Sequence, residues 1–255
     1  AAKEEKADSG ELRTYKLGVN GSDHEEWEKA NELLQKDNIK LEMVEFSDYV
    51  KPNEALEDGE IDLNAFQTEI YFNNFVKERG YTDLGILAYT QVAPMGIYSS
   101  KYKSLDEATG HLIIAIPNDV TNGGRALKFL EKNGFLTLKK EAGLTPTVMD
   151  IEKYNKDVEI VEMVATQIPA SLPDLSFACI NNGVAKDAGL TLKNDAIVYE
   201  DYKEPDMKNY WNIIAAKKDR IESEDFQKIK KAYNSDEVKQ VILEHYDGQS
   251  IPVWD

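Results

Sequence analysis

LIIAIPNDVTNGGRALKFL, residues 112–130, contains the clearest structural pattern in the chain. Residues 112–117 form a short apolar run, which predicts a buried strand. Residues 123–133 then carry apolar side chains at the spacing of an amphipathic helix, and Gly134 follows them. A buried strand that leads directly into a helix indicates an α/β protein.

The loop inside this stretch has the composition of an anion-binding turn. Gly123 and Gly124 would let the backbone approach a ligand without a side-chain clash. Free amides at the start of the following helix favour an anion, and the planar fork of Arg125 matches a carboxylate. An ordinary strand–helix turn with an exposed Arg125 explains the same residues, so the pattern alone leaves both interpretations open.

The rest of the chain repeats the alternation of strand and helix in two successive blocks. This organisation predicts two small α/β lobes with parallel sheets, and such proteins commonly bind a ligand where the lobes meet. Ser22 and Glu25 predict a capping box at the start of the first helix. The expected strands are 15–19, 39–46, 61–66, 84–92, 112–117, 158–164, 176–180 and 210–216; the other expected helices are 52–56, 71–79, a short one from Ser104, 123–133, 182–188, 223–233 and 235–246.

Composition excludes several classes of protein. The chain has 255 residues, enough for one or two domains at ~150 residues each, and 42% of them are hydrophobic, which excludes a mostly disordered protein. Lys and Arg total 30 against 47 Asp and Glu, so the net charge of −17 argues against nucleic acid as a partner and against docking on an anionic membrane. No apolar run approaches the ~20 residues that span a bilayer.

The motifs of several enzyme classes are absent from the sequence. The three histidines, His24, His111 and His245, form no zinc-binding pair, and the sequence has no nucleophile elbow, Walker A loop or dinucleotide-binding glycine motif. Cys179 is the single cysteine, which excludes an intramolecular disulfide, and its apolar neighbours predict a core residue. We therefore expect no catalytic residues, no metal and no cofactor.

A second candidate segment, residues 64–72, carries aromatic side chains at a strand-to-helix turn. Phe66 and Tyr71 flank the turn, and Tyr49 comes shortly before it in the chain. Aromatic residues at such positions are more often part of the core, so the residues alone favour packing over binding.

Several longer motifs resemble the NlpA family of substrate-binding lipoproteins, the methionine-type solute receptors of ABC importers. The similarity extends over residues 15–246, and its motifs occur in the family's order. They are FSDYVKPNEAL (46–56), GEIDLNAFQ (59–67), PMGIYS (94–99), PNDVTNGGR (117–125) and DEV (236–238).

The resemblance implies a type II periplasmic-binding-protein fold, an α/β fold with two lobes and a ligand cleft between them. Two crossing strands, 95–99 and 212–216, would join the lobes. The implied domains are a flexible tether (1–13), a first lobe (14–98 and 211–255) and a second lobe (99–210).

The resemblance also implies which residues contact the ligand. The side-chain pocket falls on aromatic residues, whose rings suit a thioether. Arg125 would bind the α-carboxylate, and asparagine amides would bind the α-ammonium and the carboxylate. Thr68 stands where the methionine-binding members have a histidine. The implied ligand-binding residues are Tyr49, Phe66, Thr68, Tyr71, Asn122, Arg125, Asn181 and Asn212.

The implied function is that of a solute receptor, not an enzyme. It would bind L-methionine or a close analogue and deliver it to an ABC permease with its ATPase. The receptor would be a monomer, held at the outer face of the bacterial cell membrane by a lipid on a cysteine upstream of residue 1. The alternatives are a receptor for a methionine-containing dipeptide or another amino acid, a two-lobed enzyme, and a surface adhesin.

Overall fold

The computed structural model describes residues 10–255, which form two compact units. Unit 1 comprises the described residues up to Val92 together with Pro205–Asp255, and unit 2 comprises Ala93–Glu204. Most of the predicted tether, residues 1–9, lies outside the described residues. The tether was expected to extend to residue 13, but Arg13 already begins the first strand.

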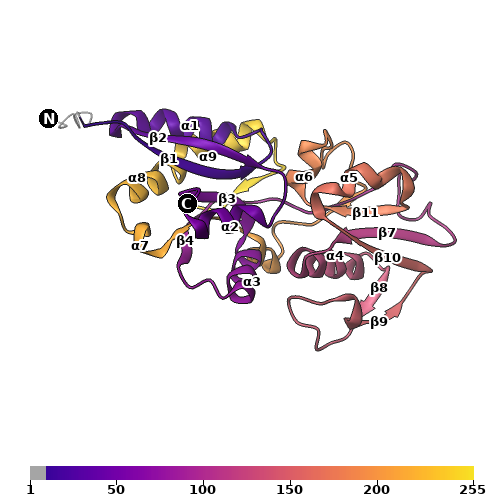
Figure 1. Cartoon of the computed structure of the whole chain (residues 1–255). Coiled ribbons are helices and arrows are strands. Elements are labelled where there is room, and N and C mark those ends of the chain that lie inside the picture. Colours follow the sequence, from indigo (N-terminus) through magenta and orange to yellow (C-terminus); the bar gives the residue numbers. More distant parts are fainter. Residues whose placement is uncertain (1–9) are drawn as a thin grey trace. The chain divides into compact units, whose positions relative to one another are not determined.

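A five-stranded mixed sheet forms the centre of unit 1 (Figure 1). The second strand runs parallel to the first, and so does the third. The strand contributed by the C-terminal part of the chain runs antiparallel to both of its neighbours, so the prediction of a purely parallel sheet was wrong. In sheet order the strands are β2 (Ile39–Phe46), β1 (Arg13–Asn20), β3 (Leu63–Thr68), β13 (Asn212–Lys217) and β4 (Leu84–Tyr89).

Helices cover both faces of this sheet. In β13, Ile214 and Ala216 belong to the core under α1, α8 and α9, whereas Ile213 and Ala215 belong to the core under α2 and α3. This alternation follows from the two-residue period of a strand, and it explains why residues 213–216 of β13 are all apolar. The helices are α1 (Glu25–Leu34), α8 (Glu224–Tyr233) and α9 (Asp236–His245) on one face, and α2 (Lys51–Asp58) and α3 (Glu69–Arg79) on the other.

Short elements complete unit 1. Strands β5 and β14 form a two-stranded antiparallel ladder, which holds the C-terminal segment of the chain against the unit. The elements are η1 (Gln35–Asp37), β5 (Gln91–Val92), η5 (Pro205–Tyr210), α7 (Lys218–Ile221) and β14 (Ile251–Pro252).

Unit 2 has a second five-stranded sheet, again mixed. The predicted apolar strand, now β7, lies next to the sheet's centre and is parallel to both of its neighbours, β10 and β11. Strand β6 is antiparallel to β11 and β12. In sheet order the strands are β10 (Val158–Met163), β7 (Leu112–Pro117), β11 (Phe177–Ile180), β6 (Gly96–Tyr98) and β12 (Val198–Tyr199).

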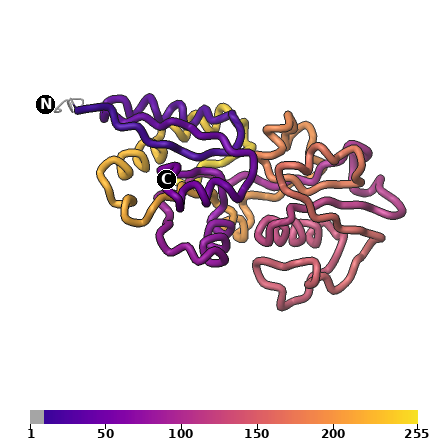
Figure 2. Tube along the Cα trace, in the orientation of Figure 1, coloured from indigo at the N-terminus to yellow at the C-terminus, as the bar shows by residue number. Residues whose placement is uncertain are grey.

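The predicted amphipathic helix, α4 (Val120–Lys132), packs on this sheet. Its Leu127 and Leu130 are fully buried together with Ile114 of β7 and Cys179 of β11, so the expectation of a core cysteine is confirmed. Figure 2 follows the chain from β7 directly into α4. The remaining elements are β8 (Leu136–Leu138), η2 (Val148–Asp150), β9 (Ile151–Tyr154), η3 (Ala165–Gln167), α5 (Ile168–Ser171), η4 (Leu172–Asp174) and α6 (Asn182–Asp187).

The chain passes between the units six residues earlier than expected at both places. The observed boundaries follow Val92 and Glu204, against the predicted 98 and 210. Residues 96–98 hydrogen-bond to β11 and β12 and are therefore part of the unit 2 sheet. In the same way, β13 is an interior strand of the unit 1 sheet. Each segment that was expected to cross between lobes is an interior strand of one lobe.

Two local predictions were wrong for identifiable reasons. The segment from Ser104 is a series of turns and not a helix. Its apolar residues Tyr102, Leu105 and Ala108 pack on the core, and their three-residue spacing resembles that of a helix. Helix α1 has His24 as its N-cap residue and no side-chain cap, so the capping box expected at Ser22 does not form.

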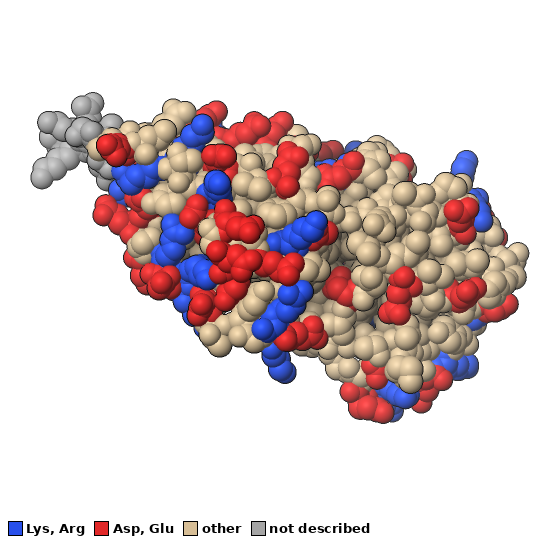
Figure 3. Space-filling view, viewed as in Figure 1, with Lys and Arg blue, Asp and Glu red and all other residues tan. Residues whose placement is uncertain are grey.

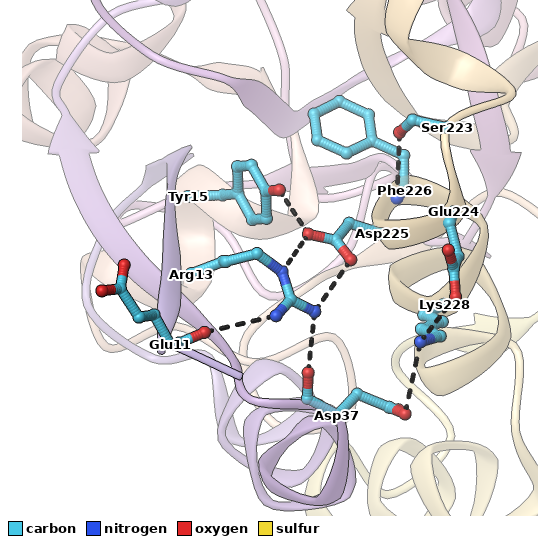
Figure 4. A network of polar contacts seen from close by, with 9 residues as sticks. All are labelled: Glu11, Arg13, Tyr15, Asp37, Ser223, Glu224, Asp225, Phe226 and Lys228. Atoms are coloured by element: carbon cyan, nitrogen blue, oxygen red, sulfur yellow. Dashed lines mark hydrogen bonds and ion pairs between the residues drawn. The ribbon is translucent and has the colours of Figure 1, made fainter. Parts of the chain in front are cut away.

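A polar network fixes the start of β1 to helix α8 (Figure 4). Arg13 donates two hydrogen bonds to the carboxylate of Asp225, through Nε at 2.7 Å and Nη2 at 3.1 Å. Tyr15 also donates to Asp225, and the Arg13 guanidinium reaches the backbone oxygen of Asp37 at 2.9 Å. The Arg13 hydrogen bond is the main reason that the pKa of the Asp225 carboxyl lies below its usual value.

Charged side chains of both signs are interspersed over the face of unit 1 that is visible in Figure 3. On the same view the surface of unit 2 is mostly neutral, with charged groups concentrated near its margins. No basic stripe of the kind that follows a phosphate backbone is visible on this face.

Candidate functional site

Unit 1 brings the three predicted aromatic residues together as an aromatic cluster (Tyr49, Phe66 and Tyr71). The ring centroids lie 6.0–6.1 Å apart in all three pairs, with tilted or edge-on geometry. The Tyr71 hydroxyl donates to the backbone oxygen of Tyr49 at 2.6 Å, which fixes the loop before α2 against α3. Tyr71 is buried, whereas Tyr49 and Phe66 are half-buried, so the cluster is part core and part surface.

A buried amide network (Asn53, Asn64 and Gln67) lies beside the aromatic cluster in the chain, and sequence reasoning missed it. Asn53 and Gln67 exchange two hydrogen bonds of 2.8 Å. Asn64 donates to Asn53 at 2.9 Å and accepts from Gln67 at 3.0 Å. The network joins α2 to β3 and thereby fixes Phe66, which lies in β3 next to Gln67. Polar residues on an otherwise buried strand were the available signal.

Thr68 and Asn212 lie at the same end of the unit 1 sheet, where they are paired across β3 and β13. Thr68 is the N-cap of α3, and its hydroxyl accepts from the Tyr71 backbone N–H at 3.2 Å. The Asn212 amide donates to the backbone oxygen of Gln91 at 3.0 Å. The hydroxyl of Thr68 thus has a structural partner at the position where a ligand contact was expected.

In unit 2, the loop from β7 to α4 differs from the expected anion site. Asp119 is the N-cap of α4, and its carboxylate accepts from the Asn122 backbone N–H at 2.9 Å. The helix start therefore already has a side-chain acceptor of its own. A Cβ on Gly123 would lie 2.8 Å from the Pro117 backbone oxygen, and one on Gly124 would lie 3.0 Å from Pro146. The glycines allow close packing of α4, which is a different reason from the expected approach of a ligand.

Asn122 and Asn181 are brought together at the carboxyl ends of neighbouring parallel strands. Asn181 follows β11, and its amide donates to the Asn122 side-chain oxygen at 3.0 Å. Asn122 in turn donates to the Asp119 carboxylate at 3.1 and 3.2 Å. Burial is the main reason that the pKa of Asp119 is raised, although these hydrogen bonds oppose the effect.

Arg125 forms a buried ion pair with Glu200, a partner that the sequence did not reveal. The Arg125 Nη2 lies 2.7 Å from Glu200 Oε1, and Nε donates to the same carboxylate at 3.1 and 3.2 Å. Nη2 also donates to the backbone oxygen of Ala93 at 3.0 Å. The two side chains are 4% and 10% exposed. Because they are 75 residues apart in the chain, no sequence spacing could have linked them.

Residues 10–255 contain neither a cluster of metal-ligating side chains nor a membrane-spanning helix. The described residues include no group of three or more His, Cys, Asp or Glu side chains placed to hold a metal ion. Among the helices of this range, none is both long and apolar enough to cross a membrane.

Comparison with known proteins gives the family. The profile of the NlpA lipoprotein family matches residues 15–254. The chain belongs to the NlpA lipoprotein family. The D-methionine-binding lipoprotein MetQ of Escherichia coli K12, a relative, is 40% identical over 243 residues, which cover 94% of this chain and 88% of the relative.

Solved structures of similar proteins confirm the fold class. A nutrient-binding protein from Burkholderia cenocepacia, bound to methionine, has a TM-score of 0.88 and 36% identity, and the match covers 94% of this chain and all of that one. The substrate-binding protein of a methionine transporter from Streptococcus pneumoniae has a TM-score of 0.88 and 38% identity, with 94% and 96% covered. This NlpA-family chain thus has the two-lobed α/β fold of substrate-binding proteins.

Proposed function

We propose that this chain is the substrate-binding lipoprotein of an ABC importer and that its ligand is methionine. The observation that carries the proposal is the match, over 94% of the chain, to the structure of a nutrient-binding protein bound to methionine. The relatives are described as binding proteins, which supports a receptor over the enzyme alternative.

The aromatic cluster is the proposed contact for the ligand's side chain. Three rings about 6 Å apart present ring edges and faces of the kind that pack favourably against a thioether sulfur. Two of the three rings are only half-buried, so apolar surface remains for a ligand to cover. Thr68, at the end of the same strand as Phe66, stays a proposed neighbour of the side chain.

The polar residues are the proposed contacts for the charged groups of the amino acid. Asn122, Arg125 and Asn181 lie in unit 2, and Asn212 lies in unit 1. Arg125 is the proposed partner of the α-carboxylate. Because Glu200 already pairs with its Nε and Nη2, the ligand carboxylate would join an existing ion pair. We propose that Glu200 holds the guanidinium at a fixed angle, so that little side-chain entropy is lost on binding.

The alternative ligands differ from L-methionine in stereochemistry or in size. Relatives are named for D-methionine, whereas L-methionine was the first expectation from the sequence. Thr68 is smaller than the histidine of methionine-binding members, which keeps a methionine-containing dipeptide or another amino acid as the second candidate.

Mass spectrometry of the small molecules released when the purified protein is denatured tests this proposal. The expected species is methionine, in amounts approaching one per chain. A chiral separation then assigns the enantiomer. Release of a dipeptide or a different amino acid would favour the second candidate, and release of a chemically altered product after incubation with methionine would point to an enzyme.

We further propose a lipid anchor at the outer face of the bacterial membrane, delivery to a permease with its ATPase, and a monomeric receptor. The family name and the lipoprotein relatives support the anchor. Metabolic labelling of the full-length precursor with a radioactive fatty acid tests it, and substitution of the acylated cysteine is expected to abolish the label.

Size-exclusion chromatography with light scattering tests the proposed monomer and is expected to give the mass of one chain, 28.8 kDa.

A further inference from the structure

A chain of side-chain hydrogen bonds in unit 2 ends on an oxygen without a partner. The chain, which we call the amide relay, consists of Asp119, Asn122 and Asn181. The Oδ1 atom of Asn181 is buried and accepts no hydrogen bond from any residue in the described part of the chain. A buried acceptor of this kind lowers the stability of the fold unless a hydrogen-bond donor from outside the chain satisfies it.

The direction of each hydrogen bond in the amide relay follows from Asp119 at its start. The Asp119 carboxyl oxygens accept from the Thr121 hydroxyl and from the Asn122 backbone N–H, and Asn122 turns its NH2 group toward the same oxygens. The oxygen of Asn122 then faces Asn181, which has to donate its own NH2 group. Asn181 is left presenting its oxygen, and no amide in the relay can reverse without breaking a bond.

Asn181 does not use this oxygen for the local role that its position suggests. It is the N-cap of α6, where an asparagine oxygen normally accepts a backbone N–H, yet it makes no side-chain cap hydrogen bond. Asp119 and Thr68, at the starts of α4 and α3, both make that bond. Local structure therefore leaves the Asn181 oxygen unused.

We infer that Asp119 and Asn122 are positioning residues that orient Asn181 so that its oxygen accepts a hydrogen bond from the ligand's ammonium group. The inference rests on the proposed function and deepens it. In this inference Asp119 does not contact the ligand, but it makes the site prefer ligands that carry a protonated amine. It also gives Asn122 a role through Asn181 in addition to its proposed ligand contact.

The test compares methionine with 4-(methylthio)butanoate, the same molecule without its amino group. Calorimetric titration of the ligand-free full chain with each compound gives a ratio of the two dissociation constants. For the parent, methionine is expected to bind roughly tenfold to a hundredfold more tightly, the range for a hydrogen bond to a charged group.

Asp119→Asn is the informative variant, because asparagine is as good an N-cap as aspartate but its amide can both donate and accept. The relay then loses its fixed direction, and the preference for methionine over 4-(methylthio)butanoate is expected to fall by about tenfold, because the affinity for methionine falls in much larger proportion. Asp119→Ser, which also keeps the cap and removes the charge, replaces it if the asparagine variant does not fold. Asp195→Asn is the matched control, since Asp195 also caps a backbone N–H, that of Thr191, at 2.8 Å in the same unit.

The outcomes separate this inference from the proposed function. If the parent prefers methionine and the Asp119 variants lose both affinities in equal proportion, or lose none, Asp119 does not orient the ammonium acceptor and the inference is wrong. If the parent binds both compounds equally, Asn181 does not accept from an ammonium group. If the parent binds neither compound, the proposed function is wrong and the inference falls with it.

Discussion

At the scale of single residues, the ion pair between Arg125 and Glu200 changes how the proposed carboxylate contact has to be tested. Arg125→Ala is expected to weaken binding of every amino acid alike by about 2–5 kcal/mol, or ~30-fold to several thousandfold. The same variant leaves the Glu200 carboxylate buried without this partner, which is expected to lower the free energy of unfolding by about 3–5 kcal/mol.

The double variant Arg125→Met/Glu200→Gln separates these two effects. Removal of both charges is expected to restore most of the stability, as measured by urea denaturation, without restoring the affinity for methionine. Recovery of binding in the double variant would contradict a carboxylate contact at Arg125, and full binding by Arg125→Ala alone would do so directly.

Thr68 has a structural role that competes with its proposed ligand contact. Loss of its hydroxyl in Thr68→Val is expected to destabilise the protein by about 1 kcal/mol, the usual cost of a lost N-cap, whereas Thr68→Ser is expected to be nearly neutral. Thr68→His is expected to change the ranking of methionine, a glycine–methionine dipeptide and leucine. Unchanged affinity ratios in that variant would mean that residue 68 does not contact the variable part of the ligand.

At the scale of elements, the network of Arg13 and Asp225 joins β1 to a helix that follows more than 200 residues later. Asp225→Asn is expected to lower the free energy of unfolding by about 1–2 kcal/mol, because the pair is partly buried and bidentate. Glu224→Gln is the control on the same helix, since Glu224 is 84% exposed and its pairing with Lys228 should contribute within about 0.5 kcal/mol. Equal effects of the two variants in chemical denaturation would contradict the assigned role of the network.

A histidine that contacts two carboxylates lies near the start of the strand pair β7 and β10. The ring of His111 lies 2.9 Å from Glu159 and 3.0 Å from Asp157, and these hydrogen bonds hold the pKa of His111 above its usual value. A raised histidine pKa stabilises the fold at pH values below the unfolded-state pKa, about 6.5, and this contribution is lost as pH rises through the folded-state pKa. An NMR titration is expected to give a raised pKa for His111 that falls in Glu159→Gln. A value unchanged by that substitution would rule out the contact.

The elements show where sequence reasoning succeeded and where it failed. Strand β7 and helix α4 were predictable because their apolar periodicity is strong and local. The antiparallel placement of β13 was not, because it depends on a strand that returns from the far end of the chain. The same limit applies to the site. The aromatic residues and the two asparagines of the amide relay were expected as ligand contacts from the family resemblance, whereas the pairing of Arg125 with Glu200 and of Asn122 with Asn181 depends on segments that are distant in the sequence.

At the scale of the whole molecule, ligand binding is expected to raise the stability of the chain by mass action. At a methionine concentration 100 times the dissociation constant, the gain is about 2.7 kcal/mol. The midpoint of thermal unfolding should therefore rise with methionine and remain unchanged with an unrelated charged amino acid such as glutamate. A midpoint that does not depend on methionine concentration would be inconsistent with a methionine receptor.

The most direct test of the central claim is a calorimetric titration of the full chain with methionine, after bound ligand has been removed by unfolding and refolding. The account predicts saturable binding of one methionine per chain, with both enantiomers measured separately, and a loss of affinity when Phe66 or Tyr71 of the aromatic cluster is replaced by alanine. Absence of heat from either enantiomer, in protein whose circular dichroism shows a native fold, would contradict it.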